Sequence, residues 1–115
     1  MNAIVDKQIL RGHLPVLVLA ILAEQPRHGY AICKQLKARR SQALGLGEGT
    51  LYPLLYRLER QGHIRGEWQT GQRGKPRKVY RITASGRRQI RAHKADWQLL
   101  MQLFKEFMGR EWVET

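Results

Sequence analysis

Two short segments of alternating apolar and polar residues, joined by a turn rich in glycine and cations, constrain the fold of this chain most. Residues 64–68 and 78–82 each alternate in the way that β-strands with one covered face do. The nine residues between them contain two glycines, one proline and three cations, which are Arg73, Lys75 and Arg77. The sequence therefore predicts a β-hairpin with a strongly basic tip.

Three segments with helical apolar spacing precede this hairpin. The first ends near Glu24, and Pro15 within it is a candidate for a new helix start. A second helix is predicted over residues 28–40, with an apolar face formed by Ile32, Cys33 and Leu36.

The third helix is predicted from Gly49 or Thr50 to Gly62. Pro53 is tolerated only if it lies in the first turn, where a backbone N–H has no partner to lose. Gly62 suits the left-handed conformation that ends many helices. The residues predicted to face inward are Leu51, Leu54, Leu55 and Leu58.

A long final helix is predicted to begin after Thr83, which serves as its N-cap. Apolar residues recur along this helix at helical spacing over about 25 residues, or about 37 Å at 1.5 Å per residue. Such a stripe is too large to remain in water on so small a chain. Together with Ile9 from the first segment, the stripe residues predicted to form a dimer interface are Ile90, Trp97, Leu100, Phe104 and Phe107.

The order helix, helix, helix, strand, strand, helix indicates a mainly α fold with a small β-hairpin, in the α+β class. We predict a winged helix-turn-helix over residues 1–82 and a dimerisation helix over residues 83–115, in one compact unit.

The charge of the chain indicates its partner. Lys and Arg number 21 against 9 Asp and Glu, so that the net charge is +12. A domain this basic is suited to nucleic acid or to an anionic membrane surface. Twelve of the cations lie between Arg57 and Lys94, which places the excess on the hairpin and its neighbours.

Several classes of protein are disfavoured by what the sequence contains. The longest apolar run, Leu14–Ala23, is about half the ~20 residues of a membrane-spanning helix. The single cysteine, Cys33, allows no internal disulfide and favours a cytoplasmic location; it is interpreted as a small buried residue, with a redox sensor as the alternative. No arrangement of residues predicts an enzyme, a cofactor or a metal site; the four histidines are His13, His28, His63 and His93.

A set of short motifs, in order and over residues 10 to about 90, carries a family resemblance. They are Leu10–Gly12, Leu14–Pro15, His28–Tyr30, Gly49–Leu55, Arg57–Glu59, Gly62, Ile64, Arg77–Thr83 and Gly86. Each is weak alone, but together the chain resembles the PadR-type transcriptional regulators, in the subgroup with a single C-terminal helix. The resemblance implies a homodimeric DNA-binding regulator, usually a repressor. Its two third helices would enter successive major grooves of a pseudo-palindromic operator, about 34 Å apart.

The residues expected to contact DNA lie on three elements. On the third helix they are Thr50, Tyr52, Tyr56 and Arg57; on the hairpin they are Arg73, Lys75 and Arg77; and at the start of the second helix they are His28 and Tyr30. Two alternatives stay open: Tyr52 packs beneath the hairpin, and Tyr30 fills a core edge beside a closely packed Gly29.

Trp97 is the candidate effector residue. Some members of the family that this chain resembles hold a planar aromatic compound between tryptophans of the two last helices. The alternative is that Trp97 only packs the dimer interface. Two rival functions are a protein that coats DNA or an anionic surface through charge alone, and a dimerising partner that has lost DNA binding.

Overall fold

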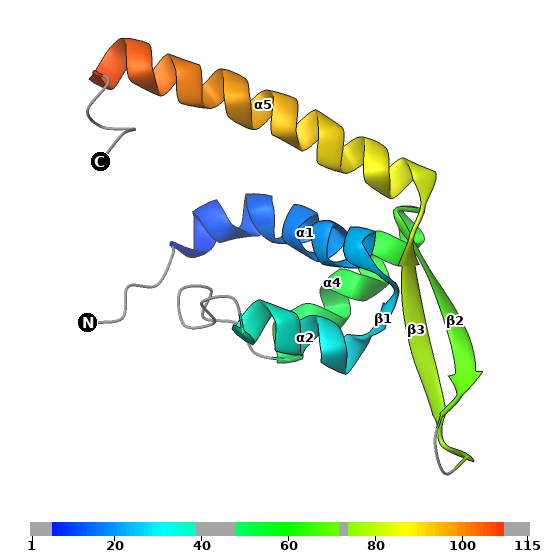
Figure 1. Ribbon diagram of the computed structural model, residues 1–115. Coiled ribbons are helices and arrows are strands. Elements are labelled where there is room, and N and C mark those ends of the chain that lie inside the picture. Colours follow the sequence, from blue (N-terminus) through cyan, green and yellow to red (C-terminus); the bar gives the residue numbers. More distant parts are fainter. Residues whose placement is uncertain (1–5, 39–47, 72–73, 110–115) are drawn as a thin grey trace.

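The structure, a computed structural model, describes residues 6–38, 48–71 and 74–109. Its elements (Figure 1) are α1 (Lys7–Glu24), β1 (Arg27–His28), α2 (Gly29–Ala38), α4 (Glu48–Arg60), β2 (Ile64–Thr70), β3 (Pro76–Ile82) and α5 (Ala84–Met108). The predicted fold class, mainly helical with a small antiparallel sheet, is confirmed. None of the helices in these ranges is both long and apolar enough to cross a membrane.

The sheet has three strands in the order β1-β3-β2, so the prediction of a hairpin alone was incomplete. The first strand, β1, follows the end of α1, and its Arg27 and His28 pair with Tyr80 and Val79 of β3. Two residues are too few to show the alternation that predicts a strand. Arg27 and His28 form a strand only because they pair with the free edge of β3. The hairpin strands extend further toward the tip than predicted, from Ile64↔Ile82 to Thr70↔Pro76.

The core lies where α1, α2 and α4 meet the base of the sheet. The predicted inward residues of α2 and α4 are all buried, including Cys33. From α1 and the sheet the core receives Leu10, Leu14, Val18, Leu19, Ile21, Leu22, Ile64 and Tyr80. Burial of one side of α4 leaves its other side to solvent, which is how a helix comes to present a polar face.

Three helix boundaries differ from the prediction. The helix α1 begins at Lys7, capped by Asp6, and runs through Pro15 without a new start. Buried leucines on both sides of Pro15 hold the helix together across the missing N–H bond. Helix α2 begins at Gly29 rather than His28, its predicted end at Arg40 lies outside the described residues, and α4 begins at Glu48.

The turn between α4 and β2 is joined to the start of α5. Gly62 ends α4 with φ +81, as predicted. The side chain of Thr83 caps α5 by accepting from the N–H of Gly86 at 3.1 Å, and its hydroxyl donates to the carbonyl of Gly62 at 2.6 Å. The N–H of Thr83 also donates to the carbonyl of His63 at 3.1 Å. These bonds connect the end of α4 to the start of α5, the helix predicted to form the dimer.

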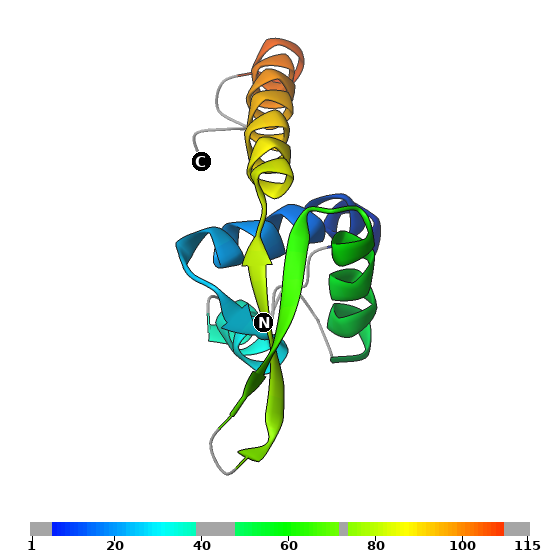
Figure 2. The ribbon, with the colours of Figure 1, turned by 90° about the vertical axis from the view of Figure 1, so that its right-hand side faces the viewer.

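Beyond this junction α5 runs alongside α1 (Figure 1), and it lies on the opposite side of the core from the hairpin tip (Figure 2). The imidazoles of His13 on α1 and His93 on α5 are hydrogen-bonded, with Nδ1 and Nε2 2.9 Å apart. The ring of His13 also meets Trp97 edge-on, with 5.7 Å between centroids. No sequence pattern indicated this contact, because 80 residues separate the two histidines.

Gly86 and Gly12 form a matched pair for testing the junction. A Cβ on Gly86 would overlap the backbone carbonyl of His63, whereas no described atom lies within 4 Å of a Cβ on Gly12. Alanine is the better helix former by about 1 kcal/mol, so Gly12→Ala should stabilise the protein by up to that amount. Gly86→Ala should instead destabilise it by about 1–3 kcal/mol, because the backbone must shift. Urea unfolding measures both, and a stabilising Gly86→Ala would show that the junction is loose.

Candidate nucleic-acid interface

The polar face of α4 is open to solvent along its length. Tyr56 is 62% exposed and Tyr52 is 46% exposed, while Thr50 and Arg57 are also exposed. The guanidinium of Arg60 lies 5.7 Å from the centre of the Tyr56 ring, which favours one position of that ring. The four predicted α4 residues therefore lie on a surface where a ligand can reach them.

Tyr52 packs against the start of α2. A Cβ on Gly29 would lie 2.7 Å from Cε1 of Tyr52, so the glycine permits the aromatic ring to approach the backbone of α2. The predicted close packing at Gly29 is confirmed. Because the ring remains half-exposed, packing and ligand contact are compatible for Tyr52.

The half-buried His28 and the exposed Tyr30 lie on either side of Gly29, against which Tyr52 packs. Nδ1 of His28 accepts a hydrogen bond from the N–H of Ala31 at 3.2 Å, so a neutral His28 carries its proton on Nε2. The ring stacks on Tyr30 with 6.4 Å between centroids, and Lys34 Nζ lies 5.9 Å from the Tyr30 ring. Tyr30 is 59% exposed, so the alternative that it fills a core edge is wrong.

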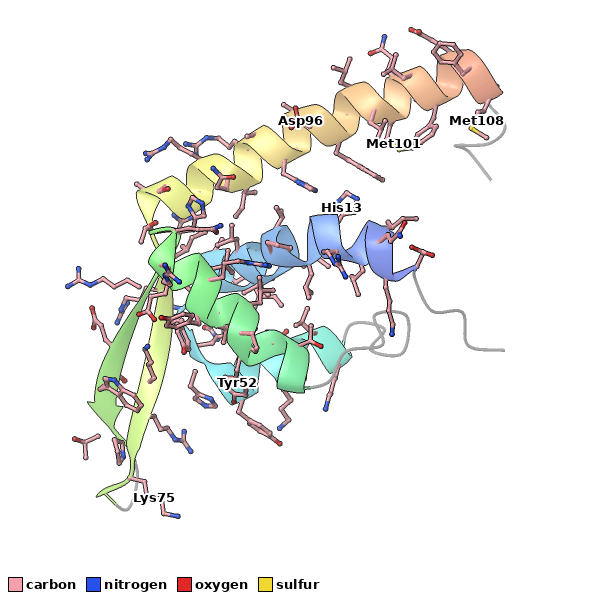
Figure 3. All side chains as sticks on the ribbon, turned by 180° about the vertical axis from the view of Figure 1, so that it is seen from behind. His13, Tyr52, Lys75, Asp96, Met101 and Met108 are labelled. Carbon is pink, nitrogen blue, oxygen red and sulfur yellow. The ribbon has the colours of Figure 1, made fainter. Side chains whose placement is uncertain are left out.

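The basic tip of the hairpin extends past these side chains. Lys75 and Arg77 are exposed, whereas Arg73 lies outside the described residues. Tyr52 and Lys75 lie on the side of the molecule away from α5 (Figure 3). The structure thus brings α4, the start of α2 and the hairpin tip to one side, where cations and phenol hydroxyls can meet phosphate oxygens.

A carboxylate on α4 holds the hairpin in place, which the sequence reasoning missed. Glu59 accepts from Lys78 Nζ at 2.9 Å and from the N–H of Gly66 at 3.0 Å. The bond from Lys78, assisted by that from Gly66, keeps the pKa of Glu59 below its usual value despite partial burial. The same bond raises the pKa of Lys78. We call Glu59, Gly66 and Lys78 the wing clamp, where the wing is the β2–β3 hairpin.

The other side of the hairpin carries a looser set of charges. Glu67 lies 3.8 Å from Arg65 and 4.0 Å from Arg81, at the limit for ion pairs. These side chains are substantially exposed, so the pairs contribute little to stability.

Comparison with known proteins identifies the family. Residues 18–92 match the model of the transcriptional regulator PadR-like family. A protein of Lysinibacillus sphaericus is 31% identical over 104 residues, covering 90% of this chain and 95% of that protein. The chain belongs to the PadR-like family of transcriptional regulators. The family resemblance drawn from the motifs is therefore confirmed.

Solved structures of transcriptional regulators agree with this assignment. A PadR family transcriptional regulator from Eggerthella lenta is 39% identical, with a TM-score of 0.76 over 88% of this chain and 86% of that chain. A transcriptional regulator from Clostridium thermocellum is 29% identical, with a TM-score of 0.77 over 88% and 98% of the two chains. The PadR fold is a winged helix of the DNA-binding type, with the β2–β3 hairpin as its wing.

In this PadR-like chain the predicted interface residues on α1 and α5 fall into two groups. Ile9, Trp97, Leu100 and Phe107 are exposed, and Phe107 is the most exposed at 83%. Ile90 instead packs against the core of its own chain, and Phe104 is half-buried. The stripe therefore has an intramolecular part at Ile90, near the junction, and a mostly exposed part beyond His93 in which Phe104 is half-buried.

The wing clamp should make stability depend on pH. The pKa of Glu59 is lowered by folding, so its contribution is present above the usual glutamate value of about 4.3 and is lost as the pH falls through the lower folded value. For Lys78 the pKa is raised, so its contribution is complete below about pH 10 and lost above. Glu59→Gln should lower the free energy of unfolding by about 0.5–1.5 kcal/mol at pH 7, and the difference in this free energy between variant and wild type should narrow toward pH 3.

Urea unfolding at several pH values, with Glu67→Gln as the control, checks this expectation. The control removes a carboxylate of the same hairpin whose ion pairs are long and exposed, so it should cost less than about 0.5 kcal/mol. Equal effects of the two substitutions at pH 7 would contradict the role given to the wing clamp.

Proposed function

We propose that this PadR-like regulator binds duplex DNA sequence-specifically as a homodimer and acts as a repressor. The observation that carries the proposal is the exposure of Tyr56 and Arg57 on α4, next to the cationic wing. The rival function, a protein that coats DNA through its charge alone, would not require polar side chains on a helix that is anchored to the core.

The geometry of α4 suits reading of bases. Its buried leucines anchor one side of the helix to the core, and the opposite side carries Tyr52, Tyr56 and Arg57. A major groove about 12 Å wide admits a helix, and a guanidinium can donate two hydrogen bonds to a guanine edge. Phenol hydroxyls can donate to phosphate oxygens, which places the helix without reading the sequence. We therefore assign base recognition to Arg57 and positioning to the tyrosines.

The wing and the start of α2 supply contacts to the DNA backbone. Lys75 and Arg77 extend beyond the core on a tip whose backbone turns at Gly74, with φ +75. Arg73, in the same tip, belongs to this proposal through its sequence position. Nε2 of a neutral His28 can act as a donor, because Nδ1 already accepts from Ala31. Such contacts add affinity for any sequence.

Dimerisation is proposed through the mostly exposed part of α5 beyond His93. Trp97, Leu100, Leu103 and Phe107 are exposed large apolar residues on one helix, which a monomer rarely leaves in water. A two-fold dimer would pair this helix with its copy and present two α4 helices to two half-sites about 34 Å apart. Binding of such a dimer across a promoter would block transcription.

An effector between the two α5 helices is a finer hypothesis within this proposal. Trp97 is exposed and lines an open hollow of about 470 Å³ with Gln98, Met101, Gln102 and Lys105. A flat aromatic ligand would stack on its indole. The edge contact with His13 supports the alternative, in which Trp97 has a packing role.

DNA binding can be tested by comparing operator with unrelated duplex. Arg57→Ala should weaken operator binding more than binding to unrelated DNA, by about 1–3 kcal/mol for each base that the variant no longer recognises. Tyr56→Ala should weaken binding to both DNAs, because its hydroxyl is assigned to a phosphate and not to a base. Lys75→Ala should weaken both DNAs alike and reduce the slope of log affinity against log salt by about 0.9. Competition binding with a duplex selected from a random pool measures these effects. If the wild type prefers no sequence, the coating function replaces the regulator.

Dimerisation can be tested by placing charge on the stripe. The double substitution Leu100→Glu with Phe104→Glu should cost several kcal/mol of dimerisation free energy, because unpaired carboxylates would be buried. Ala95→Glu is the matched control, since Ala95 is exposed and helical spacing places it on a different side of α5 from Leu100 and Phe104. Sedimentation equilibrium distinguishes the species, and a folded wild-type monomer at micromolar concentration would overturn the proposal.

A further inference from the structure

Trp68 is an exposed aromatic residue on the wing that neither the core nor the predicted interface uses. It lies on β2 and is 70% exposed. The other aromatic side chain of the hairpin, Tyr80, is buried in the core. Its indole combines a large apolar surface with an N–H donor, a combination that is enriched at binding interfaces.

The alternation of β2 shows which side of the wing carries Trp68. Ile64, Gly66 and Trp68 share one face of the strand, because successive side chains point to opposite faces. Ile64 is buried in the core, and Gly66 donates to Glu59 of α4. Trp68 is therefore on the α4 side of the wing. It lies two residues nearer the tip than Gly66, the point at which α4 contacts this face.

Lys78 places a cation beside this indole. Trp68 and Lys78 are opposite each other in the β2–β3 register, so both side chains lie on the same face. Nζ of Lys78 is 6.0 Å from the Trp68 ring centre and 2.9 Å from Glu59 Oε1. The wing clamp thereby fixes the orientation of the strand that carries Trp68, and exposed Lys75 lies further along at the tip.

We propose that Trp68 packs against the sugar–phosphate backbone of duplex DNA, at the edge of the groove that receives α4. Its ring would cover the apolar face of a deoxyribose, and its Nε1–H would donate to a phosphate oxygen. The partner is DNA because the surrounding side chains on the wing are cationic and because α4 and the wing tip lie on the same side of the molecule. This inference rests on the proposed function and adds an interaction that is not an ion pair.

The interaction has a signature that separates it from the cations of the wing. Neutralising a phosphate releases counterions, so removal of a cation reduces the salt dependence of binding, whereas removal of an apolar ring does not. Trp68→Ala should weaken binding roughly tenfold on both operator and unrelated duplex, the effect expected when a large buried ring is truncated. The salt slope should remain that of the wild type. Trp68→Phe keeps an apolar ring but lacks the N–H, so its affinity for DNA should lie between those of the wild type and Trp68→Ala.

The experiment uses fluorescence anisotropy with two labelled duplexes of about 30 base pairs, long enough for two half-sites. One is selected from a random pool by the wild-type protein, and the other is a scrambled duplex of the same composition. Affinities are measured at several salt concentrations for wild type, Trp68→Ala, Trp68→Phe, Lys75→Ala and Gln69→Ala. Gln69 is the matched control, because it is the next exposed residue of β2 and its side chain points to the opposite face.

Acrylamide quenching of tryptophan fluorescence gives an independent measurement. Operator should protect part of the wild-type emission, and that protected part should be missing in Trp68→Phe. Because Trp68 is 70% exposed, both variants should unfold at the wild-type urea midpoint, which checks that the fold is intact.

Three outcomes would overturn the inference. They are wild-type affinity of Trp68→Ala, an equal weakening by Gln69→Ala, or a fall in salt slope as large as that of Lys75→Ala. The proposed function fails separately, if the wild type does not prefer its selected duplex. In that case a tenfold weakening by Trp68→Ala on scrambled duplex would still support the role of Trp68, and a wild type that binds neither duplex would overturn both.

Discussion

The close approach of α5 to the end of α4 is the constraint on which the rest of the structure depends. Gly86 lies against the backbone carbonyl of His63, and Thr83 bonds to Gly62, His63 and Gly86 at the same junction. A side chain at Gly86 would separate the two elements. Because α4 presents the polar face and α5 carries the exposed apolar stripe, this junction sets the angle between the proposed DNA-binding and dimerising parts of a PadR-like chain.

A second constraint acts on the wing. A two-stranded hairpin is marginally stable alone and would move relative to α4. Glu59 prevents this by accepting from both strands at once, from the backbone of Gly66 on β2 and from the ammonium of Lys78 on β3. The partly buried pair therefore contributes orientation as well as stability, and it determines where Trp68 and the cationic tip lie with respect to α4.

The elements were predictable because their signals are local. Helical spacing found α1, α2, α4 and α5; Thr83 and Gly62 marked a start and a stop; and alternation found β2 and β3. Features that join distant residues were not found. The strand β1 exists only through pairing with β3, the wing clamp joins residues 19 apart, and His13 meets His93 across 80 residues. Ile90 was predicted for the dimer interface and lies against its own core, because helical spacing shows that a stripe is apolar but not what covers each part of it.

The sequence by itself determined the fold class, the family, the basic wing and the apolar final helix, because each depends on residue types at short, regular spacing. The tertiary structure decided the packing of Tyr52 on Gly29, the exposure of Tyr30, the orientation of the wing and the face on which Trp68 lies. These features depend on which helices and strands pack against each other once the whole chain has folded. A side chain is predictable from periodicity as far as its own helix or strand extends, and its partners across the fold become defined only when the elements pack.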